Sequence, residues 1–419
     1  MNKRTFIRTT SLAGIGSAVA ISSFGKVINA MSSTLPIDEA AQEEQFWSEV
    51  RKGYTLPDYI NLENGYYCVQ PDEVLEQYIA NIKKVNLQGA RYMRTVQEEN
   101  KRTAAEKLAA LAGCNADELI ITRNTTESLD MIINGLDWHA GDEAVMAEQD
   151  YGAMLDMFRQ TAQRHGIVNR FISIPNDPQS DEEIVALYEN AITSKTKLMM
   201  VCHMINITGQ ILPVRKICDM AHRHGVQVMV DGAHAIAHIQ FHIPDLNCDY
   251  YGSSLHKWLS VPLGAGLLYV KEENIHKVWP LFAEGTRAKD DIARLNHTGT
   301  LPVATDLTIS AAIDYYHTIG PARKEARLRY LQQYWTSQLR EHKNVILNTP
   351  TDPARSCAIA NVGIKGMKPS AMADILMQRY NIYTVAIDNA GVHGCRITPN
   401  IYTTTTELDA LVAAIKKEA

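Results

Sequence analysis

The chain has 419 residues, of which 46% are hydrophobic and 21% charged, and its formal net charge is −6. This composition is ordinary for a folded protein with a large core, and the length suggests two or three domain-sized units. The weakly acidic balance gives no sign of a nucleic-acid partner, for which a dominant basic surface would be expected.

Seven cysteines are scattered along the chain at irregular spacing, and none forms a CxxC pair. The absence of such pairs argues against a zinc knuckle or a redox dithiol, and the odd count argues against a disulfide scaffold. We therefore interpret most of the cysteines as small buried hydrophobic residues.

Residues 1–30 have the order of regions that is typical of an export signal. A basic start with Lys3, Arg4 and Arg8 precedes a mildly apolar stretch, residues 11–25, which is too short and too rich in Gly and Ser to span a bilayer. The stretch KRTFIR resembles a twin-arginine signal in which Lys3 replaces the first arginine. We expect an exported, periplasmic protein without a stable membrane span after signal cleavage.

Residues 72–113 show the first long helical pattern, with apolar positions at three- and four-residue spacing. Short apolar runs follow, separated by helical patterns. We predict these runs as strands: ELIITRN (118–124), EAVMAEQ (143–149), RFISIP (170–175), KLMMVCHM (197–204), VQVMVDGA (226–233) and GAGLLYV (264–270). The alternation predicts an α/β fold with a mostly parallel sheet covered on both faces, and ligands bind beyond the carboxyl ends of such strands.

A change of pattern near residue 310 predicts a second, smaller domain. There a long helical pattern leads into short strands and a terminal helix. We assign residues 76–310 to a large cofactor-binding domain and residues 311–419 to a small α+β domain. We expect residues 31–75 to pack on the small domain.

Polar residues lie just past the ends of several predicted strands. Asp231 follows VQVMV, Thr125 and Thr126 follow ELIITRN, and Asn206 follows KLMMVCHM, while Lys257 lies 26 positions after Asp231 among apolar residues. Pyridoxal 5′-phosphate needs this combination: a lysine for a Schiff base, a carboxylate for the pyridine nitrogen, and hydroxyl and N–H groups at a helix N-terminus for its phosphate. The sequence therefore predicts this cofactor.

The segments VMVDGAHAIAH and GSSLHKW resemble the signature of the class V aminotransferase family, whose members are fold-type I pyridoxal-phosphate enzymes. The resemblance extends from about residue 60 to the end of the chain. It implies a seven-stranded-type, mostly parallel sheet and a homodimer with the active site at the subunit interface. It also implies a small substrate that is an amino acid or is derived from one.

The resemblance gives the matching residues individual roles around the cofactor ring. Lys257 would form the Schiff base, and Asp231 would hold the pyridine nitrogen. Asn206 would contact the phenolic oxygen and Tyr151 would stack on the ring. His234 would lie beside the imine as a further catalytic group.

Further roles implied by the resemblance concern the phosphate and the substrate. The phosphate would be bound by hydroxyl and imidazole groups of Thr125, Thr126, Ser254 and His256. Thr300, in HTGTLP, would reach the phosphate of the neighbouring subunit. Arg396, in GCRITPN, would bind the α-carboxylate of the substrate.

Each of these residues alone has a simpler interpretation. Asp231 is suited to cap a helix, Lys257 to extend to the surface, Tyr151 to fill a half-buried core position and Arg396 to form a surface ion pair. The joint occurrence of these residues in one order favours the cofactor, most strongly for Lys257 and Asp231. A catalytically silent binding protein of the same fold stays open as an alternative.

Three histidines offer a second alternative, a metal-dependent hydrolase. His234, His238 and His242 recur every four residues, which on a helix would align three imidazoles for zinc or iron. Pro244 and the alternation in HIQFHI argue against a continuous helix there. We therefore predict no metal at this site.

The sequence leaves the reaction open among epimerase, lyase and aminotransferase chemistry at the α- or β-carbon. The VDGAHA and DYGAM segments are similar to the isopenicillin N epimerase-like branch of the family. An epimerase needs acid/base groups on both faces of the α-carbon. Lys257 would serve one face, and His234, Tyr151 or a tyrosine of ENGYY the other.

Cysteine desulfurases of the family carry a nucleophilic cysteine on a mobile loop well before the carboxylate-binding arginine. Here the corresponding stretch, VAIDNAGVHGC, is short and holds only Cys395, which directly precedes Arg396. A cysteine beside the carboxylate anchor is badly placed to accept sulfur, so we do not expect a desulfurase of that kind.

Overall fold

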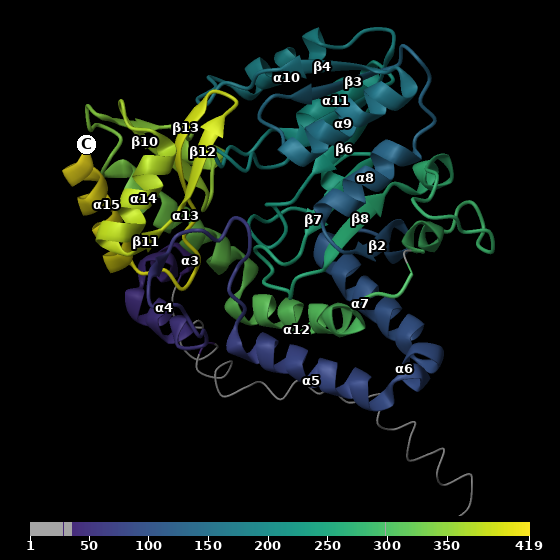
Figure 1. The fold of residues 1–419 in the computed structure, drawn as a ribbon, viewed down its shortest axis with the longest axis horizontal. Coiled ribbons are helices and arrows are strands. Elements are labelled where there is room, and N and C mark those ends of the chain that lie inside the picture. Colours follow the sequence, from purple (N-terminus) through teal and green to yellow (C-terminus); the bar gives the residue numbers. More distant parts are fainter. Residues whose placement is uncertain (1–27, 29–35, 298) are drawn as a thin grey trace, which may run out of the picture.

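The structure is a computed structural model that describes residues 28, 36–297 and 299–419. The predicted export signal lies outside the described residues except for Ile28, which is fully buried in the same hydrophobic cluster as Phe46 and Trp47. A large lobe and a smaller lobe are evident in Figure 1. Among the described residues, no helix combines the length and the apolar character that crossing a membrane requires.

A seven-stranded sheet forms the centre of the large lobe, in the order β2-β8-β7-β6-β5-β3-β4. Every neighbouring pair is parallel except the two that β8 makes with β2 and β7, so the predicted α/β fold with a mostly parallel sheet is confirmed. The strands are β2 Leu119–Thr122, β3 Glu143–Ala147, β4 Val168–Ile172, β5 Thr196–Cys202, β6 Gln227–Asp231, β7 Tyr250–Ser254 and β8 Gly266–Val270.

Hydrophobic clusters bury both faces of this sheet except at the edge strand β4, whose residues are exposed or half-buried, and this burial explains why the inner strands are nearly continuous apolar runs. Neighbouring residues of one strand point into different clusters, as Met199 and Met200 of β5 do. The covering helices are α8 Thr125–Gly135, α9 Gly152–His165, α10 Asp181–Asn190 and α11 Val214–Arg223.

Strand β7 was not predicted, because its sequence YYGSS contains no aliphatic residue. Its small residues are needed where α8 crosses the strand. A Cβ on Gly252 would lie 2.7 Å from the Cδ2 atom of Leu129 in α8, which is closer than side-chain packing allows. Close packing of α8 therefore requires the glycine of this strand, whereas Tyr250 and Tyr251 are buried in the two hydrophobic clusters.

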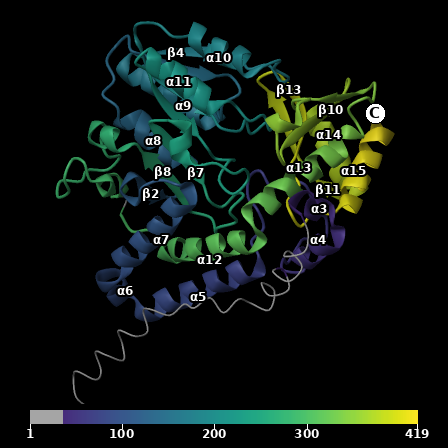
Figure 2. The ribbon, with the colours of Figure 1, turned by 180° about the vertical axis from the view of Figure 1, so that it is seen from behind.

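The predicted helix over residues 72–113 is three helices, α5 Asp72–Gln88, α6 Ala90–Thr95 and α7 Gln97–Ala112. The first break lies at Gly89, whose φ of 52° is outside the helical region. The helical pattern after residue 310 is likewise divided into α12 Val303–Ile319 and α13 Pro321–Ser337, because Gly320 has a φ of 90° and a proline follows it. Figure 2 shows α12 lying beside α5 and α7, on which it packs.

The smaller lobe contains an antiparallel sheet in the order β12-β13-β10-β9. Its strands are β9 Val345–Leu347, β10 Ala360–Ile364, β12 Val385–Asn389 and β13 Val392–Ile397, and its helices are α14 Pro369–Tyr380 and α15 Thr405–Glu418. The early elements α3 Ile37–Gln42, α4 Glu44–Arg51 and β1 Ile60–Asn61 precede the large lobe in sequence. Of these, α3 packs on α13, and β1 pairs with β11 Ile382–Tyr383 of the small lobe. The domain boundaries given above stay predictions.

Candidate active site

A cavity of about 330 Å³ lies at the carboxyl ends of β6 and β7, between the two lobes. All the predicted site residues except Thr300 line this one cavity: Thr125, Thr126, Tyr151, Asn206, Asp231, His234, Ser254, His256, Lys257 and Arg396. Thr300 is exposed and outside the cavity lining, so its role toward a neighbouring subunit stays a prediction.

Lys257 is partly buried in a turn that follows β7. Desolvation is the main cause that lowers the pKa of its ammonium to about 8, although the nearby Asp231 carboxylate opposes this change. More of Lys257 is therefore a neutral amine near neutral pH than is usual for a lysine, and only the neutral amine is a nucleophile or a base.

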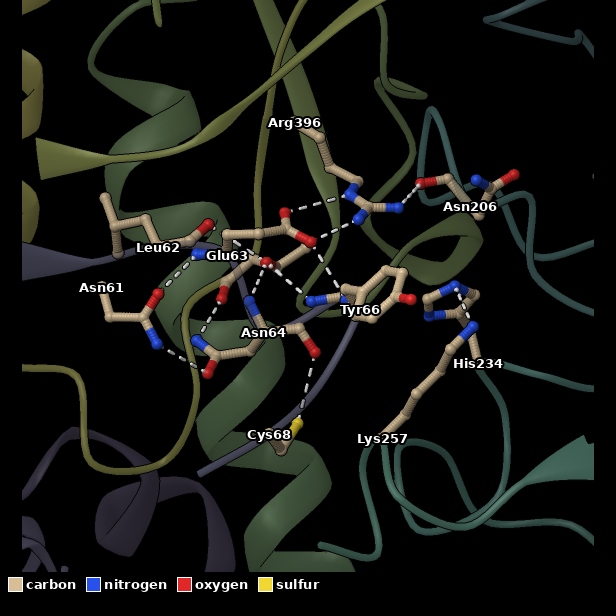
Figure 3. Close-up of polar contacts among 12 residues, drawn as sticks. Asn61, Leu62, Glu63, Asn64, Tyr66, Cys68, Asn206, His234, Lys257 and Arg396 are labelled. Carbon is tan, nitrogen blue, oxygen red and sulfur yellow. Dashed lines mark hydrogen bonds and ion pairs between the residues drawn. The ribbon is translucent and has the colours of Figure 1, made fainter. Parts of the chain in front are cut away.

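His234 lies next to Lys257, as Figure 3 shows, with its Nε2 atom 3.1 Å from the lysine Nζ atom. The indole N–H of Trp258 donates to the other ring nitrogen, Nδ1, at 3.3 Å. Burial lowers the pKa of His234 well below its usual value, so the ring is neutral. Because Nδ1 accepts a hydrogen bond, the single ring proton resides on Nε2 and is donated toward Lys257.

His238 keeps the Trp258 indole in place by stacking on it, with ring centroids 3.8 Å apart. Its Nδ1 atom bonds the His234 carbonyl at 2.7 Å, and its Nε2 atom accepts from the Ala358 N–H at 2.9 Å. Both nitrogens are therefore occupied by the chain, while His242 is exposed. Within residues 36–297 and 299–419, no three potential metal ligands gather, so the geometry does not favour the metal alternative.

Asp231 ends β6 and is 4% exposed. Its Oδ1 atom accepts from the Ala233 N–H at 3.0 Å, and burial raises its pKa. The following residue must be glycine, because a Cβ on Gly232 would lie 2.0 Å from the Tyr251 ring. The strand end is thus tightly packed, and it presents a carboxyl group to the cavity.

The N-terminus of α8 gathers hydroxyl and N–H groups on another wall of the cavity. Asn124 caps the helix by accepting from the Glu127 N–H at 2.8 Å. The Ser254 hydroxyl lies 2.9 Å from the Thr125 N and 2.7 Å from its hydroxyl, which joins β7 to the helix start. Thr126 also lines the cavity at this point. Such a helix end attracts phosphate.

These groups fit pyridoxal phosphate by their chemistry. The cavity offers an amine of lowered pKa, a carboxyl group and a set of hydroxyl donors at a helix N-terminus. The buried Nδ1 atom of His256 has no hydrogen-bond partner in the described part of the chain, which is consistent with a polar group that completes the site. Tyr151, which is 45% exposed, stands at the cavity mouth and also lines a second cavity of about 770 Å³.

The small lobe contributes Arg396 from β13, and here the structure adds a residue that the sequence did not reveal. Glu63 forms a buried ion pair with Arg396, and the two residues are 8% and 7% exposed. The Arg396 Nη1 atom also donates to the Asn206 carbonyl at 3.3 Å. The two partners are separated by 333 residues in the sequence, so no local sequence pattern indicates the pair.

Trp258 is the second residue that sequence reasoning missed. In the sequence it is one of the apolar residues around Lys257, whereas in the structure its N–H decides which nitrogen of His234 carries the proton. A tryptophan directly after the lysine, together with a histidine three positions after Asp231, was the available signal.

Comparisons with known proteins agree with this geometry. The chain matches the family Aminotransferase class-V over residues 68–411. It is 28% identical to isopenicillin N epimerase of Amycolatopsis lactamdurans over 75% of this chain and 84% of the relative. It is also 28% identical to a probable cysteine desulfurase of Halobacterium salinarum (strain ATCC 700922 / JCM 11081 / NRC-1), over 91% of this chain and 96% of the relative.

Two solved structures show the same fold. The apo structure of the cysteine desulfurase from Thermococcus onnurineus NA1 has a TM-score of 0.78 and 22% identity, covering 88% of this chain and 97% of the other. The cystine C-S lyase C-DES with its product cysteine persulfide has a TM-score of 0.78 and 22% identity, covering 85% and 97%. With the family match and the assembled site, we conclude that the chain belongs to the class V aminotransferase family and is a pyridoxal-phosphate-dependent enzyme.

Proposed function

We propose that the enzyme moves the α-proton of an amino acid or amino-acid derivative and thereby epimerises its α-carbon. When bound, pyridoxal phosphate supplies an electron sink that weakens the bonds to the α-carbon of the attached amine. The observation that carries the proposal is the Lys257–His234 pair: a lysine whose pKa is lowered to about 8, 3.1 Å from a neutral imidazole.

In this proposal, Lys257 takes and returns the proton on one face of the α-carbon. His234 holds the lysine Nζ atom in place through its Nε2–H. Because the two side chains are in direct contact, His234 is not suited to act on the opposite face. The tyrosines that line the cavity, Tyr66 and Tyr151, are the remaining candidates for that face, and both carry a hydroxyl group.

The surroundings of two cysteines, Cys395 and Cys202, support epimerisation over desulfuration. Cys395 is fully buried within β13, and burial raises the pKa of its thiol to about 11. The strands β12 and β13 are joined only by Ala390 and Gly391, which leaves no long loop at this point. Cys202 lines the cavity, but it is 3% exposed and its pKa is raised well above the usual value.

The relatives supply further support. Isopenicillin N epimerase of Streptomyces clavuligerus is 26% identical over 88% of this chain and 97% of the relative. A lyase that breaks the bond at the β-carbon is the second candidate, because the structure of a cystine C-S lyase resembles this one and elimination needs only Lys257 as base.

Proton exchange in deuterated water separates these reactions. The cofactor-loaded enzyme is incubated with a panel of single-enantiomer amino acids and their amides, and the products are followed by proton NMR. We expect loss of the α-proton signal together with appearance of the other enantiomer. A 2-oxo acid and ammonia formed without an acceptor would indicate the lyase instead, and an oxo-acid requirement would indicate an aminotransferase.

The second proton-transfer group is identified by the same measurement in two variants. Tyr66→Phe and Tyr151→Phe remove one hydroxyl each and leave Lys257 in place. We expect one of them to abolish inversion while α-proton exchange with retention persists. Equal inversion in both variants would contradict a tyrosine on the opposite face.

We also propose that the protein is exported and forms a homodimer. The basic and apolar regions of residues 1–30 support export, and the exposed position of Thr300 outside its own cavity supports donation to a second subunit. Cleavage after Ala30 would remove Ile28, which is buried in the described structure. N-terminal sequencing of periplasmic protein tests export and cleavage together, and sedimentation tests the dimer.

A further inference from the structure

The arginine expected to anchor a substrate carboxylate already has a carboxylate partner within the chain. In Figure 3 the Glu63 side chain lies against the guanidinium of Arg396. The Arg396 Nε atom donates to Glu63 Oε2 at 3.2 Å, and Nη2 donates to Oε1. Such a bidentate, buried pair holds both side chains in a defined geometry, and removing one partner leaves an unpaired buried charge.

The backbone around Glu63 fixes this arrangement. The Glu63 N–H donates to the Asn61 side chain at 3.1 Å, and the Tyr66 N–H donates to the Glu63 carboxylate at 3.0 Å. On the other side, the Thr398 hydroxyl accepts from the Asn64 N–H at 2.6 Å and from the Gly65 N–H at 3.1 Å. The carboxylate is therefore held in place by the fold and is not a side chain that happened to reach the arginine.

Gly65 makes the close contact possible. A Cβ at this position would lie 2.8 Å from the Arg396 Cζ atom, so the guanidinium rests directly on the glycine backbone. Three of the five guanidinium N–H groups are used by Glu63 and the Asn206 carbonyl. The remaining groups still offer hydrogen bonds, but the positive charge is already balanced.

A balanced charge changes what this end of the cavity recognises. A substrate carboxylate at Arg396 would be buried close to the Glu63 carboxylate, and like charges in a water-poor site repel strongly. A neutral acceptor, such as the carbonyl of a carboxamide, accepts from the same N–H groups without this repulsion.

We propose that Glu63 is a specificity-determining residue that neutralises Arg396, disfavours a free α-carboxylate and favours amino-acid derivatives whose α-carbonyl is neutral, such as amides. This inference rests on the proposed function, because it concerns the substrate of the same site. It adds a residue that selects the substrate through the arginine and takes no part in proton transfer.

The test compares acids with their amides in binding to the cofactor-loaded enzyme. Dissociation constants for L-alanine, L-alaninamide, L-phenylalanine and L-phenylalaninamide are measured from the change in cofactor absorbance. We expect the wild type to bind each amide at least as tightly as the matching acid. In Glu63→Gln we expect the preference to shift toward the acid by at least tenfold.

Glu143→Gln is the matched control. Glu143 is also a buried carboxylate in a bidentate pair, with the more exposed Arg170 at 2.5 and 2.8 Å, but it lies at the start of β3, at the opposite end of the sheet from the cavity. The change in chemistry is the same, so we expect the acid-to-amide ratio to equal that of the wild type. Comparing this ratio between variants cancels the different amine pKa values of the ligands, because these values are the same in every variant.

The possible outcomes decide the inference. A wild-type preference for acids of more than tenfold would overturn it, even if Glu63→Gln did not fold. Weaker acid binding in Glu63→Gln, or no change, would also overturn it, because Glu63 would then only orient Arg396 or have no role in selection. The proposed function is tested separately by the proton-exchange experiment, so its failure there is distinguishable from these outcomes.

Discussion

At the large-lobe end of the cavity, Lys257 contacts a neutral histidine, whereas at the small-lobe end Arg396 is paired with the Glu63 carboxylate. Both are cationic side chains in a water-poor site, but their surroundings have opposite consequences. Desolvation without a bonded carboxylate lowers the pKa of Lys257 and makes it reactive. The bonded carboxylate balances the charge of Arg396 and makes it a hydrogen-bond donor that is selective for neutral groups.

Lys324 extends this comparison, because it is a second buried lysine whose pKa is lowered to about 8 by desolvation. It donates a hydrogen bond to the Trp258 carbonyl and does not line the cavity. A lowered pKa alone therefore does not identify the reactive lysine. Position at the ends of β6 and β7 distinguishes Lys257.

The largest effect on α-proton exchange is expected from removing the Lys257 side chain, at the large-lobe end of the cavity. Lys257→Ala should lower α-proton exchange by about 10³-fold, because a positioned general base alone contributes roughly 10²- to 10⁴-fold. Lys324→Met, which removes the other buried ammonium, should lower it far less. Proton exchange measured by NMR in both variants checks the difference, and equal losses would break the distinction between the two lysines.

A smaller effect is expected from Gly65→Ala at the small-lobe end of the cavity, where Arg396 is paired with Glu63. The new methyl group would lie 2.8 Å from the Arg396 Cζ atom and force the guanidinium away from Glu63. We expect the dissociation constants of the acids and the amides to rise about tenfold or more, which corresponds to roughly 1.4 kcal/mol of binding free energy. The cofactor absorbance should be unchanged, since Lys257 is untouched. Loss of the cofactor absorbance band in this variant would show that a change at the Arg396 end of the cavity also disturbs the Lys257 end.

The tautomer of His234 can be changed through Trp258. In Trp258→Phe the donor to Nδ1 is lost, so the ring proton should redistribute between the two nitrogens of His234. We expect α-proton exchange to fall by about tenfold, because Lys257 stays in place and only its positioning is disturbed. Nitrogen-15 NMR of the imidazole reads the tautomer directly. Trp335→Phe is the control, because Trp335 is also fully buried but its Nε1 atom has no partner among the described residues.

The smallest effect concerns the pH dependence of cofactor capture by the cofactor-free protein. Only the neutral amine of Lys257 reacts, so the rate should rise with pH and level off above the lysine pKa of about 8. The Asp231 carboxylate raises this pKa. Asp231→Asn should therefore move the midpoint to lower pH, and stopped-flow absorbance measures it. A midpoint that moves upward would contradict the assigned electrostatics.

The sequence was informative where function requires particular residue types at the ends of regular strands. Asp231 and Thr125 were placed together because apolar strand patterns predicted a parallel sheet, and the carboxyl ends of such strands meet at one edge. Lys257 follows β7, which was not predicted, so its place rested on the resemblance to the family. Helix breaks at Gly89 and Gly320 were missed, because the apolar periodicity continues across them.

Residues that act through long-range contacts were beyond local sequence reasoning. Glu63 meets Arg396 only because β1 pairs with β11 and brings the N-terminal segment onto the small lobe. Trp258 was visible beside Lys257, but its hydrogen bond to His234 depends on how two turns fold against each other. Contacts of this kind depend on tertiary packing, which residue spacing does not encode.

The central claim is that Lys257, and not another desolvated lysine, holds the cofactor. Borohydride reduction of the yellow, cofactor-loaded enzyme, followed by peptide mass spectrometry, tests it most directly. We predict the pyridoxyl phosphate label on the peptide that contains Lys257 and none on the peptide that contains Lys324. A label on Lys324, or a loaded enzyme in which Lys257 stays unmodified, would contradict the account.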